Sequence, residues 1–159
     1  MSPSETTNQH TREEWRELGF FYETQDAPHC WRIVGSKSGL GNFVKLLDEY
    51  VRDPRNEAIS EHKHYGPYMY MKVVTSESAA IDRDSIRGSV ADLGRLRDLV
   101  ANKLRDVQTG GSLVLGPEYS ASVTFPLHFE VREAGFDPAS ADPGLTERPY
   151  QGDEQPDLK

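Results

Sequence analysis

The densest group of chemically capable side chains lies in residues 61–70 (EHKHYGPYMY). In an extended chain His62 and His64 project to the same side, as a pair of metal ligands must. A complete metal site needs further ligands, and His128 and Glu130, two residues apart in another extended run, are the candidates that the sequence offers. The pattern therefore allows a metal-binding enzyme or regulator that uses His62, His64, His128 and Glu130.

The same segment can instead form a recognition surface for another protein. Tyrosine combines a large apolar ring with a polar tip, and such side chains contribute much of the energy at protein interfaces. We therefore predict that a partner contacts His62, His64, Tyr65, Tyr68 and Tyr70. A loop in which these side chains only pack or hydrogen-bond locally fits the residue types as well, and the sequence alone does not decide between these readings.

The sequence carries no recognisable catalytic signature. Residues 35–39 (GSKSG) lack the spacing of a phosphate-binding loop, so we expect them to cap a helix. A Gly-x-Ser-x-Gly motif is missing, and Cys30 alternates with His29 along a predicted strand, which suggests a buried, inert thiol. We assign no catalytic residue and no cofactor, and we favour a protein that is not an enzyme.

Composition excludes several classes of partner. The 159 residues include 18 Lys and Arg against 26 Asp and Glu, a net charge of -8, which argues against nucleic-acid binding. No apolar run approaches the roughly 20 residues of a membrane span, and the first residues lack the apolar stretch of a signal peptide. We expect a cytoplasmic protein, and its single cysteine cannot form an intrachain disulfide. The sequence does not indicate an oligomeric state.

Most of the negative charge lies near the two ends. Residues 1–17 hold two basic and four acidic side chains, and residues 133–159 hold two basic and seven acidic ones, which leaves residues 18–132 with a net charge of -1. Prolines and glycines also interrupt residues 133–159. We predict a polar N-terminal extension (1–17), a single domain (18–132) and an acidic, loosely draped C-terminal tail (133–159).

The hydrophobic pattern of the domain predicts its elements. Apolar positions recur at helical spacing in two segments, 40–51 and 89–107, and the second begins with the capping-box spacing of Ser89 and Asp92. Strand patterns cover residues 18–24, 29–34, 67–75, 85–88, 112–115 and 119–131. The order predicts an α+β domain, in which two amphipathic helices cover one face of an antiparallel-rich sheet of about five to six strands.

One stretch of the chain resembles a known class of proteins. Residues 39–50 (GLGNFVKLLDEY), the EHKHY string at 61–65 and the strand after it are similar to small α+β immunity proteins of bacterial polymorphic toxin systems. The shared pattern is a Gly-Leu start to an amphipathic helix, a His-x-His pair before a strand, and a second helix after a Ser-Val-x-Asp step, over roughly residues 35–104.

The resemblance implies a non-enzymatic role. Such a protein binds a cognate protein toxin in the cytoplasm of the producing cell and occludes the active site of the toxin. Acidic immunity proteins often face basic nuclease toxins, to which electrostatic steering would speed association. Here residues 18–132 are nearly neutral, so only the acidic ends of the chain could steer such a toxin electrostatically.

Overall fold

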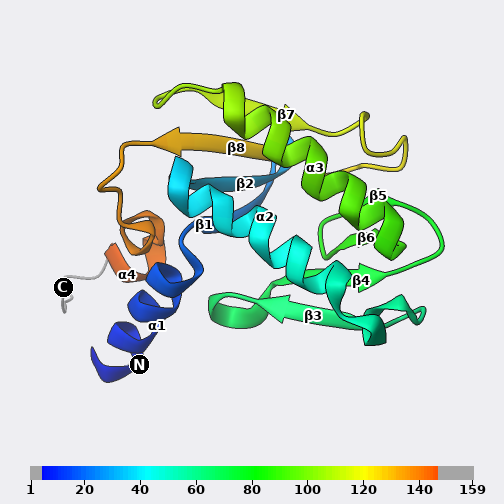
Figure 1. The fold of residues 1–159 in the computed structure, drawn as a ribbon. Helices are drawn as coiled ribbons and strands as arrows, with labels where there is room; N and C mark the ends of the chain where they lie inside the picture. The colour runs from blue at the N-terminus through cyan, green and yellow to red at the C-terminus, as the bar shows by residue number, and fades with distance from the viewer. Residues whose placement is uncertain (1–4, 147–159) are drawn as a thin grey trace.

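The computed structural model of the chain describes residues 5–146 and has an α+β fold (Figure 1). Its helices, strands and short 3-10 helices (η) are α1 (Glu5–Leu18), β1 (Phe21–Asp26), β2 (His29–Ser36), α2 (Lys37–Arg52), η1 (Pro54–Glu57), β3 (His62–Tyr65), η2 (Pro67–Met69), β4 (Met71–Thr75), β5 (Ala80–Ile81), β6 (Ile86–Gly88), α3 (Val90–Asp106), β7 (Ser112–Leu115), β8 (Leu127–Arg132), η3 (Pro138–Ala141) and α4 (Pro143–Thr146). No helix among these is both long and apolar enough to cross a bilayer.

The strands form two sheets rather than the single sheet that we predicted. The first sheet has the order β1-β2-β8-β7 and the second has the order β3-β4-β6-β5. In each sheet the two inner strands run parallel, and each outer strand runs antiparallel to its neighbour. The prediction is wrong on this point because alternation identifies strands but not their partners, and β2 pairs with β8 from the far end of the domain.

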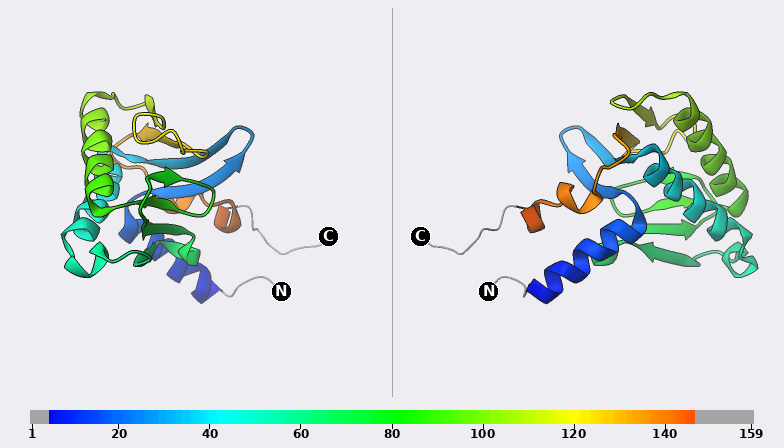
Figure 2. Two further views of the ribbon diagram at one scale, coloured as in Figure 1. Left: turned by 90° about the vertical axis from the view of Figure 1, so that its right-hand side faces the viewer. Right: turned by 60° about the vertical axis from the view of Figure 1, so that its left-hand side comes forward.

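Both predicted amphipathic helices are confirmed. The Ser36 hydroxyl accepts a hydrogen bond from the Gly39 N–H and caps α2, and the capping box of Ser89 and Asp92 starts α3. The two helices lie side by side over the same face of both sheets (Figures 1 and 2). Their apolar stripes are buried there, at Leu40, Phe43, Leu46, Leu47 and Tyr50 of α2 and at Leu93, Leu96, Val100 and Leu104 of α3.

Contacts between β5, β2 and the loop before β8 join the two sheets. The Thr124 and Phe125 N–H groups donate to the Ile81 carbonyl oxygen, at 2.9 and 3.2 Å. The Trp31 indole N–H donates to the Asp82 carbonyl oxygen at 2.8 Å. The sheets therefore share a junction as well as a helical layer.

The strand predicted over residues 119–131 is shorter than its alternation suggests. Only Leu127–Arg132 forms β8, which pairs with β7 in antiparallel orientation. Residues 116–126 form a loop that buries Tyr119 and Phe125. Phe125 is buried, Val123 is half-buried and Ala121 is exposed, so the alternating pattern of this stretch is only partly matched by burial and does not reflect a strand ladder.

The strand predicted over residues 67–75 also begins later, at Met71. Pro67–Met69 is a 3-10 turn, in which Tyr68 and Met69 have φ angles of 66° and 58°. These left-handed values are incompatible with a strand and unusual for side chains of this size. The turn therefore separates β3 from β4.

The terminal segments pack against the domain over most of their described length. In α1, predicted as an extension, Trp15 is buried in the core, and its side chain meets the C-terminal segment. Ala139 and Leu145 are buried in the same core, and the Arg16 guanidinium forms two hydrogen bonds with Asp137, at 3.1 and 3.0 Å. A few apolar side chains in polar surroundings therefore anchor both segments to the domain. Residues 147–159 of the predicted tail lie outside the described residues.

The packing of the C-terminal segment predicts a loss of stability on truncation. A chain that ends at Arg132 should melt at least about 5 °C below one that ends at Thr146, because each kcal/mol lost shifts Tm by about 2–4 °C in a protein of this size. Thermal unfolding followed by circular dichroism measures the difference. Equal melting temperatures would contradict the packing of η3 and α4.

The buried stripe of α2 predicts a second effect on stability. Leu47→Ala should lower the free energy of unfolding by about 2–5 kcal/mol, because Leu47 is fully buried between α2 and the sheets. Lys45→Ala, at an exposed position of the same helix, should change it by less than about 0.5 kcal/mol. Urea denaturation of both variants tests this, and similar values for the two would contradict the assigned helical face.

Candidate functional site

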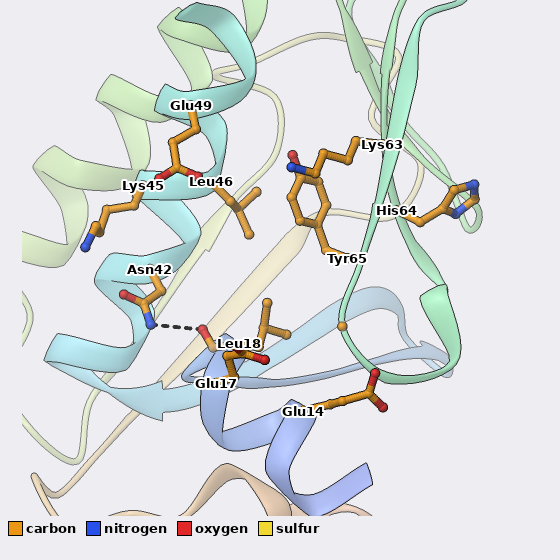
Figure 3. Close-up of a pocket in the computed structure, with 11 residues that line it drawn as sticks. Glu14, Glu17, Leu18, Asn42, Lys45, Leu46, Glu49, Lys63, His64 and Tyr65 are labelled. Carbon is orange, nitrogen blue, oxygen red and sulfur yellow. Dashed lines mark hydrogen bonds between the residues drawn. The ribbon is translucent and has the colours of Figure 1, made fainter. Parts of the chain in front are cut away.

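β3 and the turn that follows it carry the residues predicted to bind a partner. In β3 the side chains alternate, so Lys63 and Tyr65 project toward α2, whereas His64 projects to the opposite side of the strand (Figure 3). The His62 and His64 rings share that side, with their centroids 5.4 Å apart. Their Nδ1 atoms lie 3.1 Å from the Ser60 carbonyl oxygen and 3.0 Å from the Met69 carbonyl oxygen.

The four predicted metal ligands are not brought together. His128 and Glu130 lie on β8 in the first sheet, whereas His62 and His64 lie on β3 in the second sheet. Glu130 accepts two hydrogen bonds from the Arg32 guanidinium, at 2.8 and 3.2 Å, and this contact lowers the pKa of its carboxyl group. Within residues 5–146 no group of three or more His, Cys, Asp or Glu side chains is placed to hold a metal ion.

The 66–70 turn (Gly66, Pro67, Tyr68, Met69 and Tyr70) displays its large side chains to solvent. Tyr68, Met69 and Tyr70 are 52%, 60% and 69% exposed. Their rings and thioether are consecutive in the chain, and the Tyr68 and Tyr70 rings lie 5.6 Å apart between centroids. Left-handed backbone at non-glycine residues costs about 1–3 kcal/mol each, so surrounding contacts must hold the turn in this conformation.

The buried hydroxyl of Tyr22 supplies several of these contacts. It lies 2.7 Å from the Tyr65 carbonyl oxygen and 3.0 Å from the Pro67 carbonyl oxygen, to which it can donate. It also accepts from the N–H groups of Tyr70 and Met71, both at 3.2 Å. Burial raises the pKa of Tyr22 to about 12, although the hydrogen bonds from the two N–H groups act in the opposite direction and lower it. A single side chain of the first sheet thus fixes both ends of the turn.

The Asp142 carboxylate attaches the turn to the two terminal segments. Oδ2 accepts hydrogen bonds from the Tyr68 hydroxyl and from the Trp15 indole N–H, both at 2.9 Å. Oδ1 accepts from the Gly144 N–H at 2.8 Å. Asp142 is buried, and hydrogen bonds of this kind to an ionised group are stronger than neutral ones. α1, α4 and the turn therefore meet at one carboxylate.

A cavity of about 440 Å³, here called the aromatic cavity, opens beside the turn. Rings from α1, from β1 and β2, and from the turn line it, and acidic side chains complete its wall. Its lining includes Trp15, Tyr22, Trp31, Tyr68, Tyr70 and Asp84. Trp15 packs on Tyr22 at 5.2 Å and Tyr22 lies 6.0 Å from Trp31, so the floor of the cavity is a continuous aromatic cluster.

β1 is an edge strand of the first sheet, and it borders this cavity. The Trp31 N–H donates to the Pro126 carbonyl oxygen, so the main-chain groups of Trp31 point toward β8. Along a strand the main-chain N–H and C=O groups of successive residues alternate in direction, so those of Arg32 point toward β1 and pair with those of Glu23. By the same alternation, the main-chain groups of Tyr22 and Thr24 in β1 point away from the sheet. No main-chain partner for them is present among residues 5–146.

A second, more polar groove of about 670 Å³ lies between α1, α2 and β3 (Figure 3). Its charges are mixed, with Glu17 from α1, Lys45 and Glu49 from α2, and Lys63 from β3. Tyr65 lies against the groove under the Lys63 ammonium, 5.5 Å from the ring centroid, and burial raises the pKa of its hydroxyl. The mixture of charges does not indicate a class of ligand.

The structure does not bring the five predicted contact residues onto one surface. His64 and Tyr65 line the polar groove, Tyr68 and Tyr70 border the aromatic cavity, and His62 lines neither of the two. Sequence reasoning missed Trp15, Tyr22, Trp31, Asp84 and Asp142, which complete the cavity. They come from separate segments, and no spacing in the sequence connects them.

Two smaller predictions near the site are confirmed. Residues 35–39 cap α2 through Ser36. Cys30 is buried on β2, and burial raises the pKa of its thiol, as expected of an unreactive cysteine.

Comparisons of the chain with protein-family models, with curated proteins and with solved structures find no match. Function is therefore inferred from the surface itself.

The role of the Tyr22 hydroxyl predicts the behaviour of Tyr22→Phe. This change should cost about 1–3 kcal/mol, because it leaves buried N–H and C=O groups without a partner. Between pH 10 and pH 12 the unfolded chain loses a proton that native Tyr22 keeps, so wild-type stability should fall as the pH rises. The fall should be shallower in Tyr22→Phe, as measured by urea denaturation across this range.

Tyr70→Phe is the matched control for Tyr22→Phe, because the Tyr70 ring is largely exposed. It should change the free energy of unfolding by less than about 0.5 kcal/mol and keep the pH dependence of the wild type. Equal losses in the two variants would contradict the anchoring role of Tyr22.

Proposed function

We propose that this chain is a non-enzymatic binding protein that neutralises a cognate bacterial toxin by occluding its active site. In this proposal, the 66–70 turn and the adjoining aromatic cavity form the contact surface. The observation that carries the proposal is the exposure of three consecutive large side chains, Tyr68, Met69 and Tyr70, on a turn whose backbone is hydrogen-bonded to the Tyr22 hydroxyl.

Rigid display of apolar side chains favours binding over a merely solvated loop. Exposed contiguous apolar groups usually mark an interaction site, and tyrosine is enriched among residues that dominate binding energy. Because Tyr22 and Asp142 already order the turn, binding would lose little conformational entropy. The left-handed backbone at Tyr68 and Met69 is further support, since strained backbone of this kind clusters at functional sites.

The unpaired edge of β1 supports the same conclusion. A strand edge without a neighbour can pair with an extended segment of another protein. Here that edge borders the aromatic cavity at the half-buried Thr24, next to the buried Tyr22. A partner that inserts an extended segment can therefore use main-chain hydrogen bonds and aromatic contacts together.

A bacterial toxin as the partner follows from the resemblance over residues 35–104. The exposed side chains of the 66–70 turn offer shape and aromatic contacts, which do not require a high net charge of residues 18–132. No observation among the described residues favours the metal-binding alternative, because its four ligands lie on different sheets.

The proposal predicts that the chain protects a bacterial host from the toxin domain encoded beside its gene. Co-expression with the wild-type chain should restore growth. Met69→Ala combined with Tyr70→Ala should abolish protection without lowering Tm by more than a few degrees, because both side chains are largely exposed. Colony counts under toxin induction measure this.

Ile59→Ala combined with Val114→Ala is the matched control. These side chains are 54% and 48% exposed but lie outside the turn and the cavity. This variant should protect as well as the wild type. Full protection by the Met69, Tyr70 variant, or equal loss in both variants, would contradict the assigned surface, and a wild-type chain that gives no protection would contradict the proposed function.

A further inference from the structure

We propose that the aromatic cavity binds a basic side chain, arginine in particular, which the protein partner inserts beside Tyr68 and Tyr70. This inference rests on the proposed function, and it names the chemistry by which the partner is recognised. Two features of the cavity carry it, namely its aromatic wall and its charge.

The aromatic wall suits a planar cation. Tyr68 and Tyr70 form an exposed pair at the rim, with ring planes inclined by 30°, and Trp15 lies 6.4 Å from Tyr68 in an edge-on arrangement. Cations are attracted to the faces of such rings, and arginine stacks on them more readily than lysine because its guanidinium is planar and weakly hydrated.

The charge of the cavity is negative and partly uncompensated. Glu23, Asp84 and Asp142 contribute carboxylates to the lining, against the single cation Arg83 among the described residues. Arg83 is already paired with Asp26. The balance therefore favours a cation from outside over an anion.

Asp84 is the carboxylate that remains available. Glu23 is paired with Arg32 at 3.0 Å, and Asp142 accepts the hydrogen bonds described above. Asp84 is exposed, and no ion pair of its carboxylate is present among residues 5–146. A neutral occupant would cover this charge without compensating it, whereas a guanidinium can form a bidentate contact with it.

The natural fluorescence of the protein reports on this cavity. The chain has two tryptophans, Trp15 and Trp31, and both line the cavity. We would titrate the full chain with a blocked Gly-Arg-Gly tripeptide and with the same peptide carrying citrulline, which is neutral and nearly isosteric. The arginine peptide should give a saturable change in tryptophan emission, with an affinity about tenfold above that of the citrulline peptide.

Asp84→Asn should reduce the affinity for the arginine peptide to that for the citrulline peptide. Glu77→Gln makes the same change of net charge at an exposed position outside the cavity and should leave both affinities unchanged. The inference is overturned by equal responses to the two peptides, by the absence of a saturable response, or by equal effects of Asp84→Asn and Glu77→Gln.

The growth assay separates this inference from the proposed function. If Asp84→Asn protects fully while the Met69, Tyr70 variant does not, the assigned contact surface is supported and the proposal that the cavity binds arginine is wrong. If the arginine peptide binds selectively but the wild-type chain gives no protection, the cavity chemistry stands and toxin neutralisation is wrong. Loss of protection in Asp84→Asn but not in Glu77→Gln supports both.

Discussion

The buried hydroxyl of Tyr22 is the interaction on which the exposed surface depends. A buried phenol must find hydrogen-bond partners, and here they are two carbonyl oxygens at the start of the 66–70 turn and two N–H groups at its end. Because Tyr22 belongs to the first sheet and the turn links two strands of the second, this contact also sets how the sheets meet. Together with the Tyr68–Asp142 hydrogen bond, it holds the segment in which Tyr68 and Met69 adopt left-handed backbone.

The terminal segments complete the same arrangement from the other side. Trp15 of α1 and Asp142 before α4 are far apart in the sequence, yet their hydrogen bond lies under Tyr68. Some of the acidic side chains in these segments therefore have structural roles that the net charge of the segments does not indicate. One of their carboxylates is a buried structural acceptor, and another, Asp137, is paired with Arg16, which lowers its pKa.

Local patterns predicted the parts of the fold that local physics controls. The caps at Ser36 and Ser89, the apolar stripes of α2 and α3, and the strands β1 and β2 all follow from residues close in sequence. The predicted strand over residues 119–131 is too long because apolar alternation indicates burial and not strand pairing. Phe125 is buried in a loop that forms no strand. The polar composition of residues 1–17 gave no sign that Trp15 is buried in the core.

The sequence by itself determined the α+β class, the two covering helices and the exposed tyrosines as candidate contacts. The tertiary structure alone decided the division into two sheets, the separation of His62 and His64 from His128 and Glu130, and the assembly of Trp15, Tyr22, Trp31 and Asp84 around one cavity. The reason is physical: helices and turns are stabilised by neighbours in the chain, whereas a cavity and its charge arise from segments that only long-range packing brings together.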